Sequence, residues 1–139
     1  MKILIFGLPG SGKSTLAEPF AKEIGGVWIN ADKVREKYND WDFTIQGRIR
    51  QAQRMRFLAD EVVKSGSLAV ADFVCPTKQA RIEFAPDYTV WMNTIEEGRY
   101  EDTNKLFEKP DHVDYHGSKW FTLLGIFILM VILILYFVF

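Results

Sequence analysis

The stretch Gly7-Leu8-Pro9-Gly10-Ser11-Gly12-Lys13-Ser14-Thr15 decides the fold. It matches the phosphate-binding pattern G-x-x-x-x-G-K-[ST] at every fixed position. A short apolar run over residues 2–6 precedes it and predicts a buried strand, and residues 14–24 are typical of a helix. In such a strand–loop–helix unit, the loop N–H groups and the helix N-terminus surround an anion. A chance turn that carries a lysine would not account for the whole pattern, so we expect a nucleoside triphosphate to bind here.

Each polar group of this loop has an expected role. Lys13 is expected to reach the terminal phosphates, and the hydroxyl of Ser14 is expected to hold Mg²⁺. ATP and Mg²⁺ are therefore the expected cofactors. The residues predicted to bind the nucleotide are Gly7, Gly10, Ser11, Gly12, Lys13, Ser14 and Thr15.

Size and charge restrict the other functions of the chain. It has 139 residues and a formal net charge of −1, which gives no general electrostatic attraction to nucleic acid. Cys75 is the only cysteine, so no disulfide can form within the chain and a reducing cytosol is the default location. The first apolar run is too short for a signal peptide. The oligomeric state is left open, with a homodimer as one alternative.

Alternating strands and helices predict an α/β fold with three layers and a mostly parallel sheet. Further strands are expected at residues 27–29, 67–74, 88–92 and 113–115, and a long helix at residues 45–65. Asp32 follows the second strand and Asp72 lies near the end of the third, where catalytic side chains of such sheets gather. Asp32 is expected either to touch Mg²⁺ or the acceptor hydroxyl, or to cap a helix. Asp72 is either a second acid directed at Mg²⁺ or a structural hydrogen-bond acceptor.

The long helix carries arginines on different faces. By helical spacing, Arg48 points along the buried stripe, where a cation needs an anion or a carboxylate, so Arg48 is the better ligand candidate. Arg50 and Arg56 are expected in solvent. Residues 93–109 form a polar segment, here called the lid, that either closes over the nucleotide or is an ordinary surface loop. Cys75 is expected to be a packed thiol, and His112 and His116 are expected on the surface.

Several ordered motifs together resemble adenylylsulfate kinases. They are the stretch from Gly7 to Thr15, the run Ile29-Asn30-Ala31-Asp32-Lys33-Val34-Arg35, Phe43 with Arg48, and Phe73-Val74-Cys75-Pro76 with Arg81. The resemblance covers about residues 2–115. It implies a P-loop kinase that moves the γ-phosphate of ATP to the 3′-hydroxyl of adenylylsulfate.

The resemblance also implies roles for individual residues. Lys13, Asp32 and Arg48 would be catalytic, and Ser14 and Asp32 would hold the metal. Phe43 would stack on the substrate adenine, Arg48 would contact the phosphate–sulfate end, and Phe107 would be a second stacking ring. The full set of implied substrate-binding residues is Arg35, Phe43, Arg48, Pro76, Arg81 and Phe107.

The chain also departs from that family. Asn30-Ala31 stands where the family has Asp-Gly, Cys75 stands where it has Ser, and the lid is short. Two alternatives therefore stay open. One is a P-loop kinase for another nucleotide or small metabolite, and the other is a membrane-tethered nucleotide-binding module without transferase activity.

The C-terminal residues differ sharply in composition from the rest. Residues 120–139 carry no charged side chain, and as a helix they would span about 30 Å, the thickness of a bilayer core. We therefore expect a P-loop kinase domain over residues 1–118, facing the cytosol, and a transmembrane helix over residues 119–139. A buried terminal helix and a shifted reading frame are the alternatives.

Overall fold

The computed structural model describes residues 1–118, 125, 128, 131–132 and 135–136. Its elements follow in the order β1 (Lys2–Phe6), α1 (Lys13–Glu23), β2 (Val27–Asn30), α2 (Ala31–Tyr38), α3 (Ile45–Lys64), β3 (Ala69–Phe73), α4 (Lys78–Phe84), β4 (Tyr88–Met92), α5 (Glu101–Leu106) and β5 (Tyr115–Gly117). The five strands form one sheet in the order β2-β3-β1-β4-β5, and every pair is parallel. The predicted α/β fold with a parallel sheet is confirmed.

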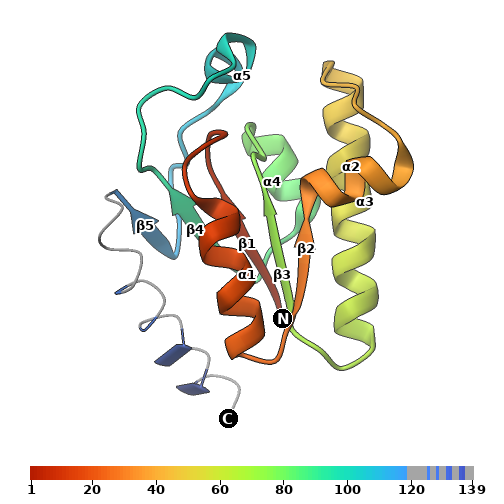
Figure 1. Cartoon of the computed structure of the whole chain (residues 1–139), viewed down its shortest axis with the longest axis vertical. Helices are drawn as coiled ribbons and strands as arrows, with labels where there is room; N and C mark the ends of the chain where they lie inside the picture. The colour runs from red at the N-terminus through yellow and green to blue at the C-terminus, as the bar shows by residue number, and fades with distance from the viewer. Residues whose placement is uncertain (119–124, 126–127, 129–130, 133–134, 137–139) are drawn as a thin grey trace.

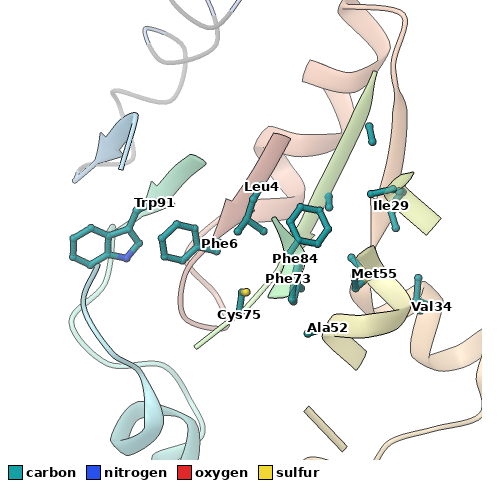
Figure 2. Packing of buried hydrophobic residues seen from close by; sticks show 13 residues of the cluster. Leu4, Phe6, Ile29, Val34, Ala52, Met55, Phe73, Cys75, Phe84 and Trp91 are labelled. Carbon is teal, nitrogen blue, oxygen red and sulfur yellow. The ribbon is translucent and has the colours of Figure 1, made fainter. Parts of the chain in front are cut away.

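Side chains of β1 alternate between the two faces of the sheet, which explains the three layers. Leu4 and Phe6 join a core cluster beneath α2, α3 and α4, which Figure 2 shows from close by. Ile3 and Ile5 join a second cluster beneath α1 on the opposite face. Because helices cover both faces, every residue of β1 is buried, as is usual for a central parallel strand.

The functional end of the sheet is set by the strand directions. All five strands run the same way, so their carboxyl ends lie along one edge, and Figure 1 shows the loop before α1 and the helix α5 at that edge. Ligands of open α/β sheets bind outside this edge. The site is therefore expected among the loops that follow β1, β2, β3 and β4.

Most predicted elements are confirmed, and the structure corrects three details. β5 begins at Tyr115 rather than at residue 113. At Asp114 the side-chain carboxylate, rather than the backbone, accepts hydrogen bonds from the N–H and hydroxyl of Thr89, so strand pairing starts only after this residue. The lid contains a short helix, α5, that the sequence pattern did not predict. Arg50 was expected in solvent but forms ion pairs with two aspartates, described below.

The predicted transmembrane helix falls mostly outside the described residues. Within the part of the chain that the structure describes, no helix is both long and apolar enough to cross a bilayer. The boundary between residues 118 and 119, the membrane helix and the cytosolic location of the first domain stay predictions.

Candidate active site

The loop between β1 and α1 has a backbone that requires glycine. Gly12, the residue before α1, has a φ of 94°, in the left-handed region that side chains rarely adopt. A Cβ on Gly7 would lie only 2.4 Å from the carbonyl oxygen of Met92, so β4 and the loop can approach only because no side chain is present. The loop is further held by the hydroxyl of Thr94, which donates to the carbonyl of Ser11 at 2.7 Å.

Lys13 lies at the first position of α1 and is almost enclosed. Lys13 is only 9% exposed. Its Nζ donates a hydrogen bond to the carbonyl of Leu8 at 2.9 Å. Burial lowers the pKa of Lys13 to about 8, an effect that the nearby Asp72 and Asp32 partly oppose and Arg99 reinforces. A buried cation whose charge is only partly balanced by nearby carboxylates is suited to bind an anion such as a phosphate.

A hydrogen-bond network joins the ends of β2 and β3 to the start of α1. The carboxylate of Asp72 accepts from the Ser14 hydroxyl at 3.1 Å, from the Asn30 amide at 3.1 Å and from the Trp28 indole. Burial raises the pKa of Asp72, and these donors act in the opposite direction. Asp72 is thus a hydrogen-bond acceptor in this structure, and it also lines the cavity described below.

Asp32 lies in the first turn of α2 but does not cap it. Asn30 is the N-cap, since its side-chain oxygen accepts from the N–H of Lys33 at 3.1 Å. The helix-cap alternative for Asp32 is therefore wrong. Its side chain instead lines the cavity together with Lys13.

The oxygen groups near Ser14 suit Mg²⁺ bound together with phosphates. Mg²⁺ in such sites uses one or two carboxylates, a hydroxyl, waters and the substrate's phosphate oxygens. Ser14, Asp72 and Asp32 all line the same cavity, so these residues fit that donor set. Within the described residues, no cluster of three or more His, Cys, Asp or Glu side chains forms a metal site by itself.

One cavity of about 740 Å³ unites the loop, the strand ends and the lid. Its size is in the range of small-molecule sites. It is lined by Pro9, Gly10, Gly12, Lys13, Ser14, Thr15, Asn30, Ala31, Asp32, Trp41, Phe43, Arg48, Asp72, Phe73, Val74, Arg99, Tyr100, Asp102 and Thr103. The predicted residues Lys13, Ser14, Asp32, Phe43 and Arg48 therefore lie around the same space.

Arg48 connects the loop that carries Phe43 to the lid. Its Nε donates to the carbonyl of Phe43 at 2.8 Å, and its Nη2 donates to the Thr103 hydroxyl at 3.1 Å and lies 3.4 Å from an Asp102 oxygen. The expectation that Arg48 needs an anionic or carboxylate partner is met by Asp102. The lid is thereby tied to the start of α3 beside the cavity.

Four predicted substrate residues do not line this cavity. Arg81 is buried against the ring of Phe6 and donates to the carbonyls of Cys75 and Glu108. The ring of Phe107 stacks at 6.4 Å from that of Phe6 and packs on the core. The carbonyl of Pro76 accepts a hydrogen bond from the N–H of Glu108. Arg35 donates hydrogen bonds to the backbone carbonyls of Asp40 and Asp42. Their role in binding substrate stays a prediction, whereas their contacts here fix the ends of loops.

The cavity also includes residues that the motifs did not single out. Trp41, Arg99, Tyr100, Asp102 and Thr103 lie on the loop before α3 and on the lid. Trp41 and Tyr100 are exposed aromatic side chains in polar segments, a pattern that favours ligand contact and could have identified them. Cys75 is fully buried and burial raises its thiol pKa, in agreement with the expected packed thiol.

The affinity for ATP is expected to fall as the pH rises above about 8. Lys13 is charged below its pKa of about 8 and largely neutral above it, while bound phosphates favour the charged form. ATP binding above that pH must therefore take up a proton, and Kd should rise by up to about tenfold per pH unit. Isothermal titration calorimetry in buffers of different ionisation enthalpy measures both the Kd and the proton uptake.

The control for this experiment is Lys13→Arg, because a guanidinium stays protonated over the same range. If that variant binds ATP, its Kd should not change between about pH 7 and pH 9. A wild-type Kd that is equally flat, with no proton uptake, would contradict the assignment of the pH dependence to Lys13.

The fold and the site together define a P-loop protein with a kinase fold. A sequence profile of the AAA domain matches residues 3–86, more than half of the chain, and the chain belongs to this family. The chain is also similar in sequence to adenylylsulfate kinases. It is 34% identical over 85 residues to a probable adenylyl-sulfate kinase of Aeropyrum pernix, and 32% identical over 85 residues to an adenylyl-sulfate kinase of Bacillus licheniformis.

These alignments cover 57% of this chain and 46% and 43% of the two relatives, so the chain matches less than half of their length. Solved structures extend the likeness of the fold. The APS kinase of Mycobacterium tuberculosis in complex with AMPPNP and APS has a TM-score of 0.79 at 16% identity, over 96% of each chain. Shikimate kinase of Aquifex aeolicus has a TM-score of 0.67 at 13% identity, over 95% of this chain and 94% of that chain.

Proposed function

We propose that the chain is an ATP-dependent kinase that transfers the γ-phosphate to the 3′-hydroxyl of adenylylsulfate. The observation that carries this proposal is the single cavity lined both by the P-loop and by Phe43 and Arg48. Nucleotide and acceptor can then lie side by side in one cavity, which phosphoryl transfer requires. The likeness to adenylylsulfate kinases over 85 residues supports this acceptor over others.

The proposed transfer divides the work among residues of the cavity. The acceptor oxygen bonds to the γ-phosphorus, the bond to the β–γ bridging oxygen breaks, and ADP leaves with that oxygen. Asp32 takes the proton of the attacking hydroxyl. Lys13 and the loop N–H groups stabilise charge on the phosphates. Ser14 and Asp32 would hold Mg²⁺, which would supply further positive charge to the phosphates. Phe43 and Arg48 orient the acceptor.

The test is a coupled assay of ADP release with ATP, Mg²⁺ and adenylylsulfate, on the full chain in detergent. The expected result is ADP release that depends on adenylylsulfate and yields the 3′-phosphorylated product by mass spectrometry. ATP binding without turnover would instead support the nucleotide-binding module. Turnover only with another hydroxyl acceptor would support a kinase for a different metabolite, a chemistry that the same fold serves elsewhere.

Phe43→Ala is expected to raise the KM for adenylylsulfate by about tenfold, because loss of a stacking ring costs about 1–3 kcal/mol. The ring is half exposed and lines the cavity, so its loss should leave the core intact. The KM for ATP should change less than about threefold. Steady-state kinetics with each substrate varied in turn measure both values.

The matched control is Phe57→Ala on α3, since Phe57 is 60% exposed and lies outside the cavity lining. That variant should keep both KM values. An unchanged KM for adenylylsulfate in Phe43→Ala would remove Phe43 from the acceptor site.

A further inference from the structure

We infer that Asp40 is a positioning residue for acceptor binding, and that it acts by fixing the loop of residues 39–43 against α3. This loop carries Trp41 and Phe43, both of which line the cavity. The inference deepens the proposed function, because the acceptor is the molecule whose binding depends on the loop. Asp40 itself does not line the cavity.

The carboxylate of Asp40 joins two arginines of α3. Its Oδ2 lies 2.7 Å from Nε of Arg50 and 2.7 Å from Nη1 of Arg54, and its Oδ1 lies 3.1 Å from Nη2 of Arg50. The Asp40 side chain is only 12% exposed, so these charge-assisted bonds are less screened than pairs in open solvent. The arginines hold the pKa of Asp40 well below its usual range, and the carboxylate therefore stays ionised at neutral pH.

The backbone of the loop is tied down by further contacts. Nη1 of Arg35 donates to the carbonyls of Asp40 at 2.9 Å and Asp42 at 3.1 Å, and its guanidinium lies 4.3 Å from the centre of the Phe43 ring. Arg50 also donates to the carboxylate of Asp42 at 3.1 Å. Arg35 is 5% exposed, and these loop carbonyls satisfy its buried guanidinium.

The start of α3 leaves no room for the loop to shift inward. A Cβ on Gly47 would lie 2.2 Å from the carbonyl oxygen of Asp42, so the loop contacts the helix backbone itself. The side chain of Asp42 accepts from the N–H of Thr44 at 2.9 Å, and that of Asp40 accepts from the N–H of Asp42 at 3.2 Å.

Apolar burial does not hold this loop. Trp41 is 51% exposed and Phe43 is 50% exposed, and neither belongs to a core cluster. Polar contacts must therefore supply the order that burial supplies elsewhere in the fold. A loop already ordered before the ligand arrives loses less conformational entropy on binding, which raises affinity.

The test compares Asp40→Asn with Asp60→Asn in the full chain. Asp60 is a matched control because it also lies between two cations, Lys2 and Arg56, but at a part of α3 that does not touch the loop. For Asp40→Asn we expect amide hydrogen exchange at residues 41–43 to accelerate by about tenfold and the KM for adenylylsulfate to rise by about tenfold. The kcat and the Kd for ATP should change less than about threefold. Asp60→Asn should leave all four quantities unchanged.

Two further variants keep the inference falsifiable. Asp40→Glu keeps the carboxylate and should recover part of the KM, whereas a loss due only to general destabilisation would not be rescued. Arg54→Gln removes one of the two α3 arginines paired with Asp40 and should reproduce the exchange and KM changes if Asp40→Asn does not fold. Unchanged exchange at residues 41–43 in the Asp40 and Arg54 variants would overturn the inference. If the wild type does not turn over adenylylsulfate, the proposed function fails, while the exchange data still decide whether Asp40 orders the loop.

Discussion

Lys13→Ala is expected to weaken ATP binding by at least about 100-fold and to reduce ADP release below detection. Removing one preorganised donor from a site for developing charge typically costs about 2.7–4 kcal/mol, and each 1.4 kcal/mol is tenfold. Lys13 is enclosed beside the phosphate-binding loop, so solvent cannot replace its charge. Calorimetric titration with Mg²⁺–ATP and the coupled ADP assay measure the two losses.

The same variant should not unfold the protein, which separates loss of binding from loss of structure. Burial lowers the pKa of Lys13 from 10.5 to about 8, so the charged form destabilises the empty fold at pH 7 by up to about 3 kcal/mol. Between these two pKa values the unfolded chain binds more protons, and wild-type stability should rise with pH across that window. In Lys13→Ala this rise should disappear, as urea unfolding at about pH 7 and pH 10 would measure.

Lys22→Ala is the control, since Lys22 is exposed in the last turn of α1. It should bind ATP as the wild type does. Normal ATP affinity in Lys13→Ala would contradict the assigned role of the loop.

Asp32→Asn is expected to reduce kcat by about 100- to 1,000-fold while ATP still binds within about threefold, because loss of a general base typically costs 10²–10⁴. Asp32 lines the cavity and is not required as the helix cap, so the amide should be tolerated structurally. Single-turnover kinetics with adenylylsulfate separate the chemical step from nucleotide binding.

Glu36→Gln, on the exposed side of α2, is the matched control and should keep the wild-type kcat. Asp72→Asn provides the comparison between the two acids of the site. If Asp32→Asn turns over normally and Asp72→Asn does not, the proposed proton acceptor is wrong. The acid at the end of β3 would then carry the essential carboxylate.

Local sequence was sufficient for the nucleotide site because its conformation depends on neighbouring residues. The glycines allow the turn, the apolar run of β1 forms a central strand, and Lys13 and Ser14 follow at fixed distances along the chain. The helix α3 was predicted for the same reason, since its apolar spacing is visible within a single segment. The position of Phe43 at the cavity followed from the resemblance of ordered motifs, whereas that of Arg48 followed from helical spacing as well.

Contacts between distant segments could not be predicted in this way. Asn30 meets Asp72 because β2 pairs with β3 in a register that places these two residues opposite each other. Arg81 and Phe107 belong to motifs that were expected to contact the substrate. In the structure they pack against the ring of Phe6, because this contact buries apolar surface.

The sequence by itself determined the P-loop, the α/β class and the residues that can bind phosphate, because these depend on short-range pattern. Only the tertiary structure decided that Asp32 lines the cavity rather than caps α2, that the lid meets Arg48, and that Asp40 pairs with two arginines of α3. The physical reason is that strand order and helix packing bring together groups that are far apart in the chain, and their charges are then satisfied by whichever partner lies within reach.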